Sequence, residues 1–173
     1  MSYALIVHAV LCLVIVVIIA KNIFIVRQEQ AMVVERLGAY HATWGMGLHF
    51  KIPFLERVAR TVMLNEQRLD SQPHPVVTRD DHRRQVDTVV YYKVVDPKQY
   101  TYSAKNPLEE LESLTATKLS NIIGEMELDR VRANRDEVSA KLYTSLEKAA
   151  EPLGLKVCRV ELKNIEHRSD RFD

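Results

Sequence analysis

The segment 84-RQVDTVVYYKVVD-96 determines the fold class that this sequence predicts. β-Branched and aromatic residues predominate in it, and alternate side chains of an extended chain lie on one face. A second apolar run, 75-PVVT-78, comes just before it, and the polar residues 79-RDDH-82 between the two runs are typical of a turn. We therefore expect a hairpin. The residues expected on its shared face are Val86, Thr88, Val90, Tyr92 and Val94.

The period of the apolar residues changes from two to about 3.6 after this hairpin, which indicates helices. Asn106, Pro107 and Glu109 form a start signal, with an N-cap residue, a proline at the first helical position and a capping-box acid. The apolar stripe that follows ends near Gly124. We expect a helix over these residues.

A second capping signature, Asn134 followed by Glu137, predicts a second helix over residues 135–153, which Gly154 ends. The stretch 155-LKVCRVELKNI-165 then returns to the character of a strand. Because strands are followed by helices and then by a strand, we predict an α+β fold, a mostly antiparallel sheet with helices packed on one face.

Earlier segments of the chain predict further strands. Residues 23–26, IFIV, are strand-like, 31-AMVVERLG-38 is a β-branched run that ends at a glycine, and 57-RVARTVMLN-65 alternates. We expect these strands to form a sheet close to the apolar N-terminus.

The N-terminus itself carries the strongest signal in the sequence. Residues 3–20, YALIVHAVLCLVIVVIIA, contain no formal charge, and twelve of them are Leu, Ile or Val. At about 0.3–0.6 kcal/mol for each such residue, insertion into lipid outweighs the penalty at His8. We predict an N-terminal transmembrane helix over 3–22. Lys21 and Arg27 follow it, which predicts a single-pass cell-membrane protein with the bulk of the chain on the cytoplasmic side.

The overall charge argues against nucleic acid as a partner. Lys and Arg total 24 residues and Asp and Glu total 23, without a basic run. The two cysteines, Cys12 and Cys158, do not form a disulfide framework. The sequence carries no metalloprotease, hydrolase or phosphate-loop motif. We therefore expect no enzyme, no catalytic residue, no metal, no cofactor and no small-molecule substrate.

One group of residues keeps a metal-dependent activity open as an alternative. His74, Asp80, Asp81 and His82 lie close in sequence, and imidazole with carboxylate is a donor set for zinc or iron. The same residues are also typical of a solvated turn, where Asp makes local hydrogen bonds. We prefer the turn.

The stretch 44-WGMGLHFKIPF-54 contains two glycines, Gly45 and Gly47, but an alternating strand follows them rather than a helix, which excludes a phosphate loop. Two interpretations remain open. The stretch forms either an apolar edge pressed into the membrane interface or a half-buried strand of the core. The predicted membrane-contact residues are Trp44, Leu48, Phe50, Ile52, Pro53 and Phe54.

Five stretches of the sequence are informative when they are taken together and in order. They are 45-GMGLHFKIPFLE-56, 86-VDTVVYYKVVDP-97, 118-KLSNIIGEMELD-129, 134-NRDEV-138 and 154-GLKVCRVELKNI-165. Together they resemble the stomatin and slipin branch of the SPFH, or band-seven, family, which includes stomatin, prohibitin and flotillin. Met46 stands where that family usually has a proline, and relatives continue beyond the final strand into an Ala- and Glu-rich helical region.

The resemblance implies an oligomeric scaffold on the lipid bilayer that organises membrane microdomains and regulates membrane proteins, including membrane proteases. A homo-oligomer and a protease partner are thus expected, and the alternatives are a protease regulatory subunit without self-assembly and a membrane-anchored metal-dependent hydrolase. The predicted organisation is a transmembrane anchor (3–22), a membrane-proximal β subdomain (23–64), an α+β SPFH subdomain (65–165) and the truncated start of a C-terminal region (166–173).

Overall fold

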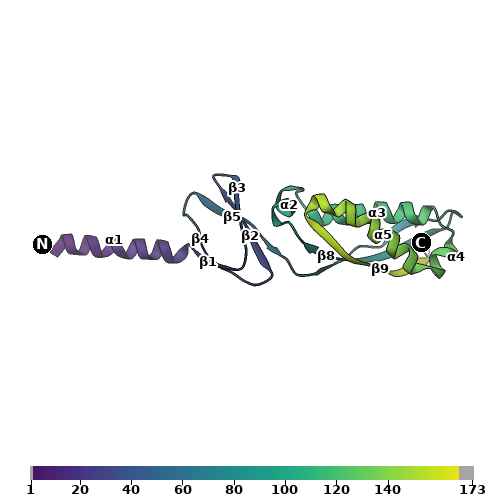
Figure 1. Ribbon diagram of the computed structural model, residues 1–173, viewed down its shortest axis with the longest axis horizontal. Helices are drawn as coiled ribbons and strands as arrows, with labels where there is room; N and C mark the ends of the chain where they lie inside the picture. Colours follow the sequence, from purple (N-terminus) through teal and green to yellow (C-terminus); the bar gives the residue numbers. More distant parts are fainter. Residues whose placement is uncertain (1, 168–173) are drawn as a thin grey trace, which may run out of the picture. The chain divides into compact units, whose positions relative to one another are not determined.

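The computed structural model describes residues 2–167 (Figure 1). The chain divides into two compact units, one up to Met63 and one from Leu64 onward. Residues 168–173 of the predicted C-terminal region lie outside the described residues.

Unit 1 begins with helix α1, Ser2–Lys21, in which Lys21 is the one charged residue. The helix forms where the apolar run predicts it. Across residues 2–167, however, none of the helices combines the length and the apolar character that crossing a bilayer requires. The prediction of a membrane-spanning helix over 3–22 is therefore not supported.

The rest of unit 1 consists of two small antiparallel sheets. Strand β1 (Ile23–Val26) pairs with β4 (Gly47–Phe50). Strand β2 (Gln30–Arg36) lies between β3 (Ala39–Trp44) and β5 (Glu56–Met63). The apolar side chains buried in this unit are Val26, Ala31, Val33, Val34 and Val62.

Unit 2 is built on strand β8 (Arg83–Val94), which contains most of the alternating segment 84–96. Strands β6 (Gln67–Asp70) and β7 (His74–Val77) pair with successive parts of one edge of β8, and β9 (Leu155–His167) pairs along the other edge. All pairings are antiparallel, as predicted. The residues expected on one face, Val86, Thr88, Val90, Tyr92 and Val94, are all buried.

The helices of unit 2 are α2 (Pro97–Tyr102), α3 (Pro107–Gly124), α4 (Leu128–Ala133) and α5 (Arg135–Ala150), followed by a 3₁₀ turn at Glu151–Leu153. Helices α3 and α5 pack on each other and on the sheet, as Figure 1 shows. This confirms the predicted α+β class. The fully buried side chains of these two helices include Leu111, Leu119, Leu142 and Leu146.

The predicted capping hydrogen bonds are wrong, although both helices begin where expected. The side chains of Asn106 and Asn134 make no cap hydrogen bond. Asn134 also ends α4, and its backbone, at φ −123° and ψ 54°, lies outside the extended region that an N-cap residue normally adopts. Asn106 is extended and exposed, but its side chain makes no such bond. The carboxylate of Asp96, which was not predicted as a cap, accepts the backbone N–H of Gln99 at 3.0 Å.

Candidate functional site

The β1–β4 ribbon in unit 1 has two different faces. The register places Ile23 opposite Phe50 and Ile25 opposite Leu48, so these four side chains share one face. All four are exposed, and Ile25 and Leu48 expose 72% and 71% of their surface. Four large apolar side chains that face solvent on one ribbon form an apolar surface of the kind that marks a binding site for protein or membrane. We call these four residues the ribbon face.

The opposite face of the ribbon is covered by an aromatic side chain. Phe24 pairs with His49, and the indole of Trp44 stacks on the His49 ring with centroids 5.0 Å apart and an interplanar angle of 6°. The ammonium group of Lys51 lies 5.3 Å from the centroid of the Phe24 ring. Trp44 therefore supports the ribbon from behind and does not lie on the ribbon face.

The loop after β4 carries further exposed apolar side chains. Phe54 is fully exposed and has a φ of +66°, a left-handed conformation that a bulky residue rarely adopts. In the neighbouring β2–β3 turn, Leu37 is exposed with a φ of +53°. Its backbone N–H donates to the carbonyl oxygen of Leu55 at 2.9 Å, so the turn and the loop lie side by side. Unusual backbone at exposed apolar residues persists only where the surroundings hold it.

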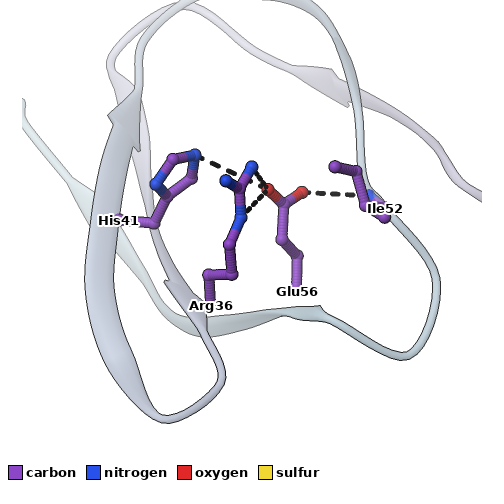
Figure 2. A network of polar contacts seen from close by, with 4 residues as sticks. All are labelled: Arg36, His41, Ile52 and Glu56. Carbon is purple, nitrogen blue, oxygen red and sulfur yellow. Dashed lines mark hydrogen bonds and ion pairs between the residues drawn. The ribbon is translucent and has the colours of Figure 1, made fainter.

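The side chain of Glu56 holds this loop. Figure 2 shows its carboxylate between residues from three directions. One oxygen accepts hydrogen bonds from Arg36, at 2.6 Å from Nη2 and 3.1 Å from Nε, and lies 3.6 Å from Nε2 of His41. The other oxygen accepts the backbone N–H of Ile52 at 2.9 Å. Glu56 is buried, and the backbone hydrogen bond from Ile52, followed by the bond from Arg36, lowers its pKa.

The consequence of this network is a fixed loop geometry. Arg36 ends β2, His41 lies in β3 and Glu56 begins β5, so the carboxylate ties three strands together at the point where the loop leaves the sheet. The backbone N–H of Glu56 also donates to the carbonyl oxygen of Ile52 at 3.0 Å, which closes the loop from both sides.

The six residues predicted to contact membrane are thus divided by the structure. Leu48, Phe50, Ile52 and Phe54 are exposed, and Trp44 and Pro53 are half-buried. Ile23 and Ile25 were not predicted as part of this surface, because IFIV is apolar at every position and its exposed face depends on the pairing of residues 23–26 with 47–50. Exposure of Leu37 in the β2–β3 turn was not predicted either.

The metal alternative finds little support in the geometry. His82 Nε2 lies 3.4 Å from a carboxylate oxygen of Asp80, whose other oxygen accepts the backbone N–H of Leu128 at 3.2 Å. A hydrogen bond from Thr78 lowers the pKa of Asp80. The residues with described positions contain no group of three or more His, Cys, Asp or Glu side chains arranged to hold a metal ion. Asp80 instead ties the β7–β8 turn to the start of α4.

Comparison with known proteins agrees with this architecture. The model of the SPFH domain / Band 7 family matches residues 24–170. A stomatin homolog from Pyrococcus horikoshii is 34% identical over 160 residues, which are 92% of this chain and 60% of that protein. Stomatin-like protein 2, mitochondrial, from Rattus norvegicus is 31% identical over 143 residues, or 83% of this chain and 40% of that protein.

An uncharacterized protein from Mycobacterium tuberculosis is 37% identical over 158 residues, 91% of this chain and 42% of its own length. The chain therefore spans about half the length of the curated relatives it matches. The family match begins one residue into β1 and covers the rest of both sheets of unit 1, the loop held by Glu56 and nearly all of unit 2. This chain belongs to the SPFH domain / Band 7 family.

Proposed function

We propose that this protein is a non-enzymatic scaffold that attaches to a membrane and associates laterally with copies of itself. The observation that carries the proposal is the ribbon face, which begins two residues after the end of the apolar helix α1. Contiguous exposed apolar side chains of this kind are stabilised when lipid covers them.

Helix α1 supports attachment to lipid. It carries no acidic residue, and its described apolar side chains, Val7 and Leu13 among them, are exposed. A helix that is apolar all round is stable only when something apolar surrounds it. We propose that α1 enters the bilayer and that the ribbon face lies in the interfacial zone beside it.

Basic side chains near this surface favour the cytoplasmic leaflet, which carries anionic lipids. Lys21 ends α1 two residues before the ribbon face begins, and the exposed Arg27 directly follows β1. Each basic residue near such a surface contributes about 1 kcal/mol of attraction. We therefore propose that the bulk of the chain lies on the cytoplasmic side of the cell membrane.

The proposed scaffold role combines membrane contact at the ribbon face with self-association. Resemblance to the family supports self-association, organisation of membrane microdomains and regulation of membrane proteins such as proteases. Physical chemistry adds that attachment to a surface raises the local concentration, so weak contacts between copies are sufficient for assembly.

Trp44 offers a direct test, because it is the single tryptophan of the chain and stacks behind the ribbon. We expect brominated anionic phospholipid vesicles to quench Trp44 fluorescence in the full chain. The variant Leu48→Ser/Phe50→Ser should lower this quenching at least twofold. The matched control Val77→Ser/Val95→Ser removes two exposed apolar side chains of unit 2 and should leave it unchanged.

Two results would contradict the membrane proposal. One is a wild-type chain whose fluorescence the brominated lipid does not change. The other is equal quenching in the ribbon variant and the wild type. Lateral association is tested separately by chemical crosslinking of vesicle-bound protein, where a ladder of self-adducts is expected and a complete lack of adducts would contradict a scaffold.

A further inference from the structure

Strand β9 forms an edge of the unit 2 sheet. It pairs with β8, and no second strand among the described residues pairs with its outer edge. The unpaired N–H and C=O groups of such an edge are a template for another strand. A groove of about 320 Å³ lies between α5 and this edge, lined by Ser139, Tyr143, Cys158 and Val160 among others. The middle of the outer edge of β9 therefore borders a groove and carries no paired strand among the described residues.

The charges along this edge alternate in sign at the same place. Arg159 and Glu161 alternate with Val160 along β9, so the two charged side chains lie on the opposite face of the sheet from Val160, and Arg159 Nε contacts the Glu161 carboxylate at 3.1 Å. The Arg159 guanidinium carbon also lies 4.3 Å from the centroid of the Tyr91 ring, which fixes its position. Val160, between the two charged residues, is buried on the helix side.

This order of residues is self-complementary in one antiparallel register. If two copies of β9 pair around a twofold axis at Val160, Arg159 of each copy lies directly opposite Glu161 of the other. Val160 then lies opposite itself, on the helix side in both copies. Moving the axis to Arg159 or Glu161 places like charges opposite each other, which destabilises a pair of strands.

Irregularities limit how far such pairing can extend. The β8–β9 register shifts between Tyr91 and Tyr92 and again between Val86 and Thr88. Only Arg159–Leu162 runs as a regular ladder between these bulges, and bulges discourage extended pairing along an edge. The contact is therefore short and weak in solution, and attachment to a membrane would make it effective.

We infer that the Arg159–Leu162 segment of β9 is a contact between two copies of this chain, formed by antiparallel strand pairing around Val160. This inference rests on the self-association proposed above and specifies its surface. Pairing of identical segments closes after two copies, so the contact makes a dimer. A larger assembly needs a second contact elsewhere.

Charge reversal on the full chain in anionic vesicles tests this register. In Arg159→Glu both positions are acidic, and in Glu161→Arg both are basic, so each variant places like charges opposite each other. We expect crosslinked dimer to fall about tenfold in each single variant. The double variant Arg159→Glu/Glu161→Arg restores opposite charges and should restore the dimer. A mixture of the two single variants should form mixed dimers, because acidic positions then face basic ones.

The control variant for Arg159→Glu is Arg132→Glu on α4, which changes the net charge by the same amount and sign outside the sheet and should leave the dimer yield unchanged. If both single variants give as much crosslinked dimer as the wild type, the β9 contact is wrong and the proposed self-association stands. If the single variants lose the dimer but neither the mixture nor the double variant recovers it, the register is wrong. A wild type that forms no adducts overturns this contact and the proposed scaffold together.

Discussion

Arg36 and Glu56 lie directly opposite each other in the β2–β5 ladder, and the guanidinium donates two hydrogen bonds to one oxygen of the carboxylate. The pair is asymmetric, since the Arg36 side chain is 40% exposed and that of Glu56 is 3% exposed. The buried partner is also the one that holds the loop, through the Ile52 N–H.

Neutralising Glu56 should destabilise unit 1. The variant Glu56→Gln keeps the shape of the side chain but weakens the bonds from Arg36 and Ile52, which as hydrogen bonds to a charged group contribute about 2 kcal/mol. We expect the free energy of unfolding to fall by about this amount, measured by denaturant titration in mild detergent with Trp44 as the probe. Glu110→Gln, an exposed residue of α3, is the control and should unfold like the wild type.

The stability of unit 1 should decrease in acid. The folded-state pKa of Glu56 lies below its ordinary value of 4.5, so the carboxylate binds a proton more weakly in the folded state than in the unfolded state. Its contribution is complete above the unfolded pKa and is lost as the pH falls through the folded pKa. We expect a Trp44-detected stability that is level near neutral pH and declines below about pH 4.5. If the stability of Glu56→Gln falls with decreasing pH as steeply as that of the wild type, the pH dependence does not come from Glu56.

Replacing Phe54 should change the stability of unit 1 and its contact with lipid in opposite directions. The side chain is fully exposed and loses no packing, while asparagine tolerates the left-handed backbone better than phenylalanine. We expect Phe54→Asn to raise the stability of unit 1 by up to about 1 kcal/mol and to lower the quenching of Trp44 by brominated lipid. A stability loss of similar size would show that Phe54 packs within the protein.

Gly154 should tolerate no side chain. Its φ is +71°, and a Cβ there would meet the carbonyl oxygen of Asp96 and the backbone nitrogen of Tyr100. We expect Gly154→Ala to lower the free energy of unfolding of unit 2 by at least about 2 kcal/mol, measured by circular dichroism. Gly124→Ala is the matched control, since a Cβ there would lie at an ordinary 3.7 Å from the Val77 carbonyl oxygen.

Tyr92 should ionise at a higher pH than an ordinary tyrosine. Burial raises its pKa to about 12. Its hydroxyl donates to Gln67 Oε1 at 3.3 Å. Because the neutral form is favoured in the folded state, the contribution of Tyr92 to stability is present below the unfolded pKa of about 10 and decreases above it. The absorbance difference between wild type and Tyr92→Phe should show a phenolate that forms near pH 12.

The elements with strong periodicity were predictable from the sequence. Residues 84–96 alternate over a long run, and the two main helices combine an apolar stripe with clear start and stop signals. The elements that were missed have no such pattern. Strand β3, Ala39–Trp44, mixes small, polar and aromatic residues at a sheet edge, and α2 is a helix of only six residues.

The candidate site was only half predictable for a different reason. Alternation alone places Leu48 and Phe50 on the same face, because residues two apart in one strand point to the same side. The contribution of Ile25 depends on the register between two strands separated by twenty residues. The meeting of Arg36 and Ile52 at Glu56 depends on three strands and a loop, and no local pattern contains that information.

The order in which the strands occur along the chain also has a consequence for synthesis. Every strand of unit 1 comes from a contiguous stretch of about forty residues, so all the strands of this unit have been synthesised before unit 2 begins. About sixty residues separate the end of β8 from the start of β9, the strand that pairs with residues 84–94 along the second edge of β8. During translation, the nascent chain therefore presents a finished ribbon while its larger sheet is still incomplete.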